Sequence, residues 1–317
     1  MSRSKKPPQD EEDHRKPPQN EEDHRKPPQN EEDHRKPPQD EEDQRERHPE
    51  EQHNALEKKE PNVTHHGLYN QGATCYLNTI LQVLYMTPEF NSRLGTESPD
   101  DRELRKIFEG LKENTCGTGN ITRLLEIKDV YQQRDAPECL EMILRKVSPK
   151  ASEVFQGEVR YTTKCSQGHI INEETNPFWT LPLSLKDTYG TLYDVESSFQ
   201  MTFQKEDLKG NNVYCKECQK KTDATKECEM VKDPQILALL LKRFDYNTMS
   251  YVKSHCFVKV PRELQTKNKE YSLYGMVNHM GSLSGGHYTA TILSNEDQTW
   301  YEFNDAQVRE AQEPPHR

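Results

Sequence analysis

Residues 67–78 read Gly-Leu-Tyr-Asn-Gln-Gly-Ala-Thr-Cys-Tyr-Leu-Asn and place one thiol, that of Cys75, where a loop passes into a helix. Gly72 marks the loop, and Thr74 stands at the expected helix N-cap. Apolar side chains then recur at helical spacing up to Pro88, at Leu77, Ile80, Leu81 and Leu84. Unpaired N–H groups in a first helical turn favour a thiolate, so the thiol is a candidate nucleophile. The same pattern also fits a small cysteine buried under a core helix.

Asn70 lies in the loop before the thiol, where its side-chain amide could donate to an oxyanion. Far downstream, a Gly/Ser-rich stretch over residues 281–286 predicts a mobile loop, and residues 288–293 predict a strand. His287 stands at their junction, where an imidazole can face an open cleft. His279 lacks this context, and we expect it to be structural.

These two strings resemble the signature boxes of the ubiquitin-specific proteases. Residues 67–78 match Gly-Leu-x-Asn-x-Gly-x-Thr-Cys-Tyr-x-Asn at every fixed position, and residues 285–290 resemble the family's histidine box. The resemblance implies that Cys75 is the nucleophile, that His287 is its base and that Asn70 stabilises the oxyanion.

The resemblance also covers the third member of the catalytic triad. An aromatic-rich strand at residues 300–304 ends in Phe-Asn and is followed by Asp305. By the family pattern, the residue after the Phe orients the imidazole; here it is Asn304, with Asp305 as its neighbour. An amide fixes the histidine tautomer as a carboxylate does, but it stabilises the imidazolium less.

Two further segments resemble the family. Residues 133–140 resemble Gln-x-Asp-Ala-x-Glu-Phe-Leu, with Cys139 in place of Phe and an unusual Pro137. In the family, this segment helps to hold the basic, glycine-ended tail of ubiquitin. The alternative is the acidic first turn of a solvated helix. The apolar run 236–244 predicts a buried strand and resembles the family's Leu-x-Leu-Lys-Arg-Phe strand.

The resemblance therefore implies a set of substrate-binding residues on both sides of a narrow channel. The glycines of this channel would admit a diglycine tail and exclude bulkier side chains. The set consists of Gln133, Asp135, Glu138, Gly285, Gly286 and Tyr288.

A tight Cys-x-x-Cys pair, Cys215 and Cys218, is of the kind that ligates zinc. Family members often carry two such pairs at the tip of a finger-like subdomain. The expected first pair begins at Cys165, but Gly168 stands where its second cysteine would be. His169 could supply a nitrogen ligand instead. The alternative is a finger held by its strands, with three ordinary thiols and no metal.

The first 60 residues differ in composition from the rest. The string Lys-Pro-Pro-Gln-(Asp/Asn)-Glu-Glu-Asp-His-Arg starts at Lys6, Lys16 and Lys26, and again at Lys36 with Gln44 in place of His. Leu56 is the only large aliphatic residue before residue 61, so we expect a disordered tail over residues 1–60. A passive spacer is the expected role; a docking or metal-binding tail is the alternative.

The net charge of -11 argues against a nucleic-acid partner, which would call for a basic face. The sequence contains no apolar run long enough to span a membrane and no secretory signal at its start. The eight cysteines are therefore expected to be intracellular thiols rather than a disulfide framework, in the cytoplasm or the nucleus.

The whole pattern predicts an α+β, papain-like cysteine protease domain over residues 66–310. By resemblance it has a helical thumb at about residues 75–150, fingers at about 154–231 and a palm built from later strands. The expected activity is hydrolysis of the bond after the C-terminal glycine of ubiquitin, with ubiquitin and ubiquitinated proteins as partners and no cofactor in catalysis. The alternatives are a ubiquitin-binding module without catalysis and a metal-stabilised scaffold with incidental thiols.

Overall fold

The structure is a computed structural model that describes residues 64–184, 193–247, 250–254, 256–282 and 285–312. The chain divides into two compact units, Met1–Lys58 and Lys59–Arg317. All described residues belong to the second unit. The predicted disordered tail lies outside the described residues. Within them, no helix is both long and apolar enough to cross a membrane.

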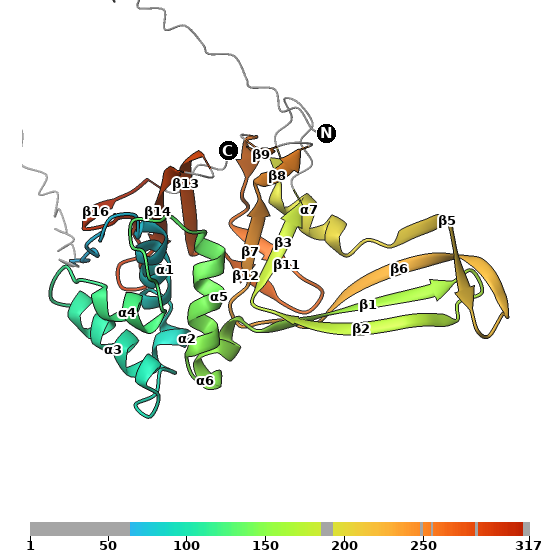
Figure 1. The fold of residues 1–317 in the computed structure, drawn as a ribbon, viewed down its shortest axis with the longest axis horizontal. Coiled ribbons are helices and arrows are strands. Elements are labelled where there is room, and N and C mark those ends of the chain that lie inside the picture. Colours follow the sequence, from blue (N-terminus) through green and yellow to red (C-terminus); the bar gives the residue numbers. More distant parts are fainter. Residues whose placement is uncertain (1–63, 185–192, 248–249, 255, 283–284, 313–317) are drawn as a thin grey trace, which may run out of the picture. The chain divides into compact units, whose positions relative to one another are not determined.

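The thumb is a group of helices around one apolar core (Figure 1). Its longest helices each turn an apolar stripe inward, as Leu104, Phe108 and Leu111 do in α3. The elements are α1 (Cys75–Tyr85), α2 (Pro88–Asn91), α3 (Pro99–Leu111), α4 (Gly119–Leu124), α5 (Ala136–Lys146), α6 (Pro149–Ser152) and the 3₁₀ turn η1 (Glu153–Phe155).

Helix α1 begins at Cys75, as the periodicity predicts, but Thr74 does not cap it through its side chain. The Thr74 hydroxyl instead accepts a hydrogen bond from the Gln71 N–H at 3.0 Å and lies 3.2 Å from Asn70 Oδ1. Thr74 is therefore the N-cap residue by position, as predicted, but its side chain makes no capping hydrogen bond. The hydroxyl serves the loop before the helix, because that loop has its own backbone donors to satisfy.

The fingers form a four-stranded antiparallel sheet in the order β2-β1-β6-β5. Alternate residues of β1 point to opposite faces: Val159 packs into an apolar cluster, whereas Arg160 pairs with Glu229 of β6. The strands are β1 (Gly157–Cys165), β2 (Ile170–Phe178), β5 (Glu206–Cys215) and β6 (Lys220–Lys232).

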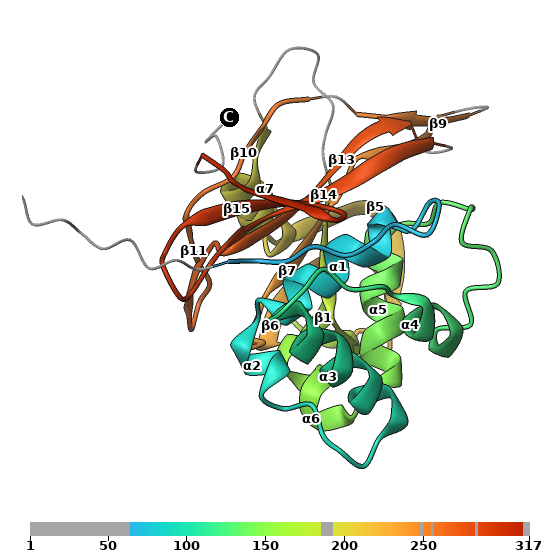
Figure 2. The same cartoon turned by 90° about the vertical axis from the view of Figure 1, so that its left-hand side faces the viewer.

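The palm contains a second antiparallel sheet, β13-β14-β15-β16. Helix α1 packs against it (Figure 2). Val83 of this helix and Met86, just beyond its end, pack against a buried cluster that includes Ala290 and Ile292 of β14. The strands are β13 (Gly275–Ser282), β14 (Gly285–Leu293), β15 (Trp300–Asn304) and β16 (Gln307–Glu310). Because α1 begins at Cys75, this packing places the cysteine of the first box beside the strand that carries His287.

Two sequence predictions for the palm need correction. The glycines expected in a loop before His287 belong to strand β14, because Gly286 pairs with Gly281 and Gly285 with Ser282 of β13. The single buried strand expected at residues 236–244 is interrupted: one residue, Arg243, separates β7 (Ala238–Lys242) from β8 (Phe244–Asn247). The apolar side chains of β7 are only half-buried, because β7 belongs to a two-stranded sheet with β3.

The remaining strands form short pairs, and one helix, α7 (Val195–Thr202), packs with them. Strand β3 (Thr180–Ser184) runs parallel to β7, and β4 (Tyr193–Asp194) runs parallel to β10 (Val258–Lys259). The antiparallel pairs are β8 with β9 (Ser250–Lys253), and β11 (Glu263–Gln265) with β12 (Glu270–Ser272).

The chain segment before α1 is fixed by its close approach to the turn between β15 and β16. A Cβ atom added at Gly67 would lie 2.3 Å from the backbone oxygen of Asp305. We predict that Gly67→Ala lowers the free energy of unfolding by about 1–3 kcal/mol, as overpacking of a tight contact does. Urea denaturation measures the loss. Gly117→Ala is the control, since its added Cβ would meet no atom within 4 Å. Equal stability of the two variants would contradict this prediction.

Candidate active site

The candidate nucleophile, Cys75, is buried under the palm sheet with 2% of its surface exposed. Its Sγ lies 3.5 Å from the backbone nitrogen of Tyr288, which donates to it from strand β14. His287, the candidate base, is therefore the chain neighbour of Tyr288, whose backbone N–H touches the thiol. The fold brings the two boxes together across about two hundred residues of sequence.

Burial raises the pKa of the Cys75 thiol, because desolvation penalises the charged thiolate. The N–H groups of Tyr288, Tyr76 and Cys75 itself lower this pKa in part, while the Asp305 carboxylate adds to the increase. The N–H groups at the helix start thus lower the pKa of the thiol, as predicted, but burial raises it by more. The raised pKa favours the thiol over the thiolate, so activation of this candidate nucleophile would require a base.

His287 is held by the end of the next strand. Its Nε2 atom lies 2.7 Å from Asn304 Oδ1. An amide oxygen only accepts, so Nε2 carries the proton in this pair and Nδ1 is left to exchange a proton with another group. The same Nε2 atom is 4.0 Å from Asp305 Oδ2, beyond hydrogen-bond range. In this geometry Asn304, rather than Asp305, fixes the ring.

Asp305 is instead bound by two amides of the cysteine box. Its carboxylate accepts from Asn70 Nδ2 at 2.9 Å and from Asn78 Nδ2 at 2.7 Å. Asp305 itself adopts a left-handed backbone conformation with φ of 51° at the turn after β15. Asn78 was missed as a site residue, although it occupies the last fixed position of the box. Its helical spacing from Cys75 was the signal.

The amide of Asn70 is fixed at both ends. Its Oδ1 atom accepts from the backbone N–H groups of Gly72 at 2.9 Å and Thr74 at 3.0 Å. Its Nδ2 atom uses one hydrogen on Asp305, and a primary amide has a second hydrogen to donate. The second N–H of this amide is therefore available to a further acceptor without reorientation of the side chain.

The predicted substrate-binding residues fall into two groups. Gln133 and Asp135 cross from the thumb to β14: Gln133 Oε1 accepts from the Gly286 N–H at 2.6 Å, and Asp135 Oδ1 accepts from the Tyr288 hydroxyl at 2.9 Å. Burial and the nearby Asp135 carboxylate raise the pKa of the Tyr288 phenol, so it remains a donor. Glu138 and Gly285 are exposed.

His279, expected to be structural, lies against the same strand. Its ring packs on that of Tyr288 with centroids 4.5 Å apart, and Lys253 Nζ lies 3.0 Å from its Nδ1 atom. Burial and the Lys253 charge lower the pKa of His279. The histidine therefore stays neutral in the neutral pH range and supports the aromatic ring beside the nucleophile.

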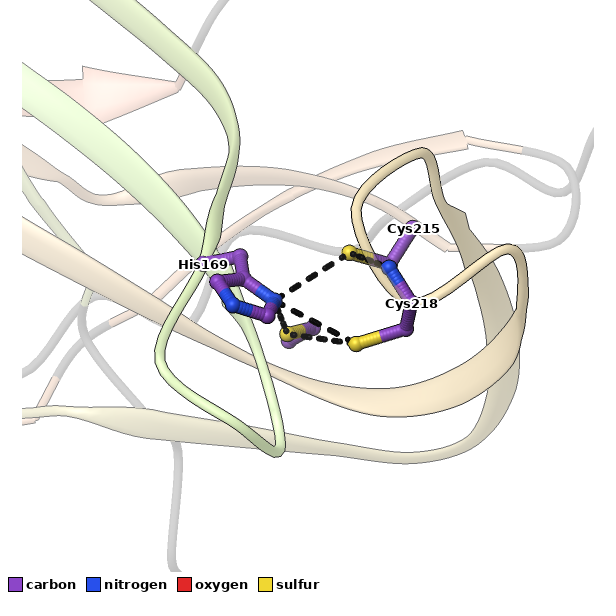
Figure 3. A group of neighbouring side chains, drawn as sticks. His169, Cys215 and Cys218 are labelled. Atoms are coloured by element: carbon purple, nitrogen blue, oxygen red, sulfur yellow. Dashed lines mark hydrogen bonds between the residues drawn. The ribbon is translucent and has the colours of Figure 1, made fainter.

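The four candidate metal ligands meet at the end of the finger sheet. Cys165 and Cys215 are the last residues of β1 and β5, and His169 and Cys218 lie in the turns that follow these strands (Figure 3 labels all but Cys165). One ligand atom from each residue lies within 4.8 Å of all the others. The His169 Nδ1 atom lies 3.5 Å from Cys165 Sγ, 3.8 Å from Cys215 Sγ and 3.3 Å from Cys218 Sγ. These four side chains can hold a metal ion.

Comparison with known proteins gives one family. The family model described as "Ubiquitin carboxyl-terminal hydrolase" matches residues 66–316. Ubiquitin carboxyl-terminal hydrolase 15 of Schizosaccharomyces pombe is 30% identical over 292 residues, covering 81% of this chain and 25% of that protein. Ubiquitin carboxyl-terminal hydrolase 47 of Homo sapiens is 27% identical over 337 residues, covering 76% and 24%. The chain spans about a quarter of the length of these curated relatives.

Solved structures share this fold. The SAGA Ubp8/Sgf11/Sus1/Sgf73 DUB module bound to ubiquitin aldehyde matches with a TM-score of 0.67 and 25% identity, covering 81% of this chain and 68% of that chain. The module bound to monoubiquitin matches with a TM-score of 0.64 and 27% identity, covering 78% and 65%. The α+β arrangement of thumb, palm and fingers predicted from the sequence is confirmed.

The raised pKa of Cys75 has a direct chemical consequence. We expect iodoacetamide to alkylate this thiol slowly at pH 7, with a rate that rises through a midpoint above the ordinary thiol value of about 8.5. Mass spectrometry of the Cys75 peptide after timed quenching measures the rate at each pH. The chain has seven other free cysteines, so the readout must be resolved by site. A rate that is already maximal below pH 7 would contradict the dominance of burial.

Proposed function

The chain belongs to the ubiquitin carboxyl-terminal hydrolase family, and on that premise we propose that its residues 66–310 form a cysteine-type deubiquitinase domain. One observation carries the proposal: strand β14 brings the Tyr288 N–H to Cys75 Sγ while its neighbour His287 is held by Asn304. A nucleophile, a base and an orienting group in this order are the elements of nucleophilic acyl transfer. The substrates are ubiquitin and proteins that carry it.

In the proposed reaction, His287 takes the proton of the Cys75 thiol, and the sulfur attacks the carbonyl carbon of the terminal glycine. The oxyanion that forms accepts from Asn70, whose amide is already oriented by Asp305. The imidazolium returns its proton to the leaving lysine amine, the C–N bond breaks, and an acyl-enzyme remains. Water, deprotonated by His287, then releases the carboxylate and the thiol. Catalysis uses only side chains of the chain and needs no cofactor.

The substrate-binding role is assigned to the channel between the thumb and β14. Asp135 and Glu138 lie at the start of α5 and place negative charge where the basic, glycine-ended tail of ubiquitin would lie. Gly285, Gly286 and Tyr288 form the opposite side. The acidic charge of the chain, -11 overall, favours a basic partner and disfavours nucleic acid.

We further propose that the cluster at the fingertips binds zinc through Cys165, His169, Cys215 and Cys218. Bonds of about 2.3 Å to sulfur and 2.0–2.1 Å to nitrogen in a tetrahedron set ligand separations of roughly 3.5–3.8 Å. The observed S–N separations of 3.3–3.8 Å and the 3.9 Å between Cys165 and Cys218 sulfurs fit this size. Zinc here would join two turns of the finger sheet and take no part in catalysis.

All eight cysteines are free. Free thiols and a thiol nucleophile suit a reducing compartment, so we place the protein inside the cell, in the cytoplasm or the nucleus. The repeats of residues 1–60 are assigned the role of a spacer, on composition alone.

The activity is tested with ubiquitin that carries a cysteine-reactive electrophile at its C-terminus. We expect a covalent adduct with the full chain and none with Cys75→Ala, and Cys116→Ala serves as the control for a thiol outside the site. Gel shift and intact mass measure the adduct. Tight binding without an adduct would indicate a ubiquitin-binding module in place of a protease. The absence of both binding and an adduct would indicate a scaffold.

The metal site is tested by elemental analysis of the purified chain and by its Co²⁺ derivative. We expect about one zinc per chain, and Co²⁺ charge-transfer absorption that signals three thiolates. Cys218→Ser should lose the metal, whereas Cys228→Ser, a finger cysteine outside the cluster, should keep it. A chain that takes up no zinc or cobalt after reduction would refute the site.

A further inference from the structure

The part of β14 that carries His287 has a neighbouring strand on one side only. Strand β14 pairs with β15 from Ala290 to Leu293, so within the described part of the chain residues 285–289 have no strand on that side. On the other side, the same residues pair with residues 278–282 of β13. Strand β13 is itself the edge of this sheet. The position of residues 285–289 therefore depends on how the end of β13 is held.

The backbone groups of this strand pair alternate between its two sides. The N–H groups of Gly286 and Tyr288 point away from β13, because they meet a thumb side chain and the candidate nucleophile. His287, between them, therefore points its N–H and carbonyl groups toward its β13 partner, Met280. By the same alternation, the residues on either side of Met280 point their carbonyl oxygens outward, away from β14.

The side chain of Lys253, from β9, binds these outward oxygens. Its Nζ atom lies 2.9 Å from the backbone oxygen of His279, 3.1 Å from that of Gly281 and 3.0 Å from His279 Nδ1. A lysine ammonium only donates, so all three atoms accept, and the neutral His279 ring carries its proton on Nε2. An ammonium has three N–H groups around one nitrogen, which suits three acceptors that converge on one point.

The backbone beside Lys253 is itself held by hydrogen bonds. Lys253 pairs with Phe244 across the β8–β9 hairpin. The Arg243 Nη1 atom donates to the backbone oxygens of Ser254 at 3.3 Å and of Cys256 at 3.0 Å. The Ser254 N–H donates in turn to the backbone oxygen of Arg243 at 2.5 Å. Because this backbone is fixed, the lysine side chain can fix the end of β13.

The two residues that Lys253 binds are in close contact with β14. The ring of His279 packs on that of Tyr288, with centroids 4.5 Å apart. Gly281 has a φ of 99°, and a Cβ atom added there would lie 2.7 Å from the Cα atom of Gly286. A displacement of β13 at these positions would therefore displace β14 on both sides of the candidate base.

We infer that Lys253 is a positioning residue of the proposed catalytic site: its ammonium takes the place of a neighbouring strand along β13 and so fixes the part of β14 that carries His287. This inference rests on the proposed function. Lys253 touches neither the substrate nor the thiol in this role. It acts through β13, because the alignment of the imidazole and of the Tyr288 N–H with the sulfur follows the position of that strand.

Two variants of Lys253 test the role of its donors. Lys253→Met keeps an aliphatic stem and loses every donor, whereas Lys253→Arg keeps the charge and several donors. For Lys253→Met we expect kcat on a fluorogenic C-terminal amide of ubiquitin to fall about tenfold, because small displacements of a positioned catalytic group are costly. KM should stay within about threefold, since the ammonium lies on the far side of the strand pair from the thiol. Lys253→Arg should recover most of the lost kcat.

The matched control is Lys259→Met. It removes a lysine from the neighbouring strand β10, where Lys259 forms a half-exposed ion pair with Asp194 at 3.3 Å. Such a pair contributes little to stability. We expect kcat and KM of this variant to match those of the wild type.

Hydrogen exchange measures the same contact without any activity. We expect amides in peptides that cover residues 279–288 to exchange about tenfold faster in Lys253→Met than in the wild type, because the end of β13 opens more often. Peptides from helix α3 of the thumb should exchange as in the wild type. Melting temperatures within about 4 °C of the wild type establish that the variants fold.

A wild-type kcat or a wild-type exchange rate in Lys253→Met would overturn the inference. A rise in KM with kcat unchanged would overturn it as well, since Lys253 would then act on substrate binding. So would a Lys253→Arg variant that is no faster than Lys253→Met, or an equal loss in Lys259→Met. A wild-type chain that does not cleave the substrate would instead refute the proposed function, and the exchange rates alone would then decide whether Lys253 holds β13.

Discussion

The site depends on the docking of the cysteine box onto the turn that follows β15. The Leu68 N–H donates to the backbone oxygen of Asp305 at 2.8 Å, and the carboxylate of the same residue accepts from Asn70 and Asn78. The turn immediately follows Asn304, which holds His287. This turn therefore positions the loop before the candidate nucleophile, the helix that carries Cys75 and, through Asn304, the candidate base. Asp305 has a left-handed backbone conformation, which is unfavourable for a residue other than glycine. These hydrogen bonds hold it in that conformation.

Burial of the candidate nucleophile disfavours its reactive thiolate form. Cys75 lies at the start of α1, where it meets the backbone of β14 and its thiolate is poorly solvated. Three backbone N–H groups offset this in part. A site of this kind keeps its sulfur protonated until a base removes the proton, which limits oxidation of the resting thiol. In the proposed reaction, removal of the thiol proton therefore depends on His287 and on the Asn304 side chain that holds it.

The sequence predicted the features that depend on local pattern. The start and end of α1 followed from the apolar spacing and Pro88, and the fold class followed from the two boxes. It could not predict the raised pKa of Cys75, because burial depends on a sheet more than two hundred residues away. Nor could it predict that the glycines before His287 would pair as strand, since glycine alone favours a loop and only the partner strand β13 overrides it. The contact of Gln133 with Gly286 joins residues 153 apart in the chain and has no local signature.

Strand β14 gives each of three successive residues a different contact: the Gly286 N–H meets Gln133, the His287 ring meets Asn304 and the Tyr288 N–H meets the thiol. The alternation of a strand makes these contacts inseparable, because inserting one residue turns every later side chain to the opposite face. Insertions and deletions in functional variants of this protein must therefore fall outside residues 285–290. Substitution can reshape this stretch, but a single-codon insertion or deletion within it would place the imidazole on the wrong side of the sheet.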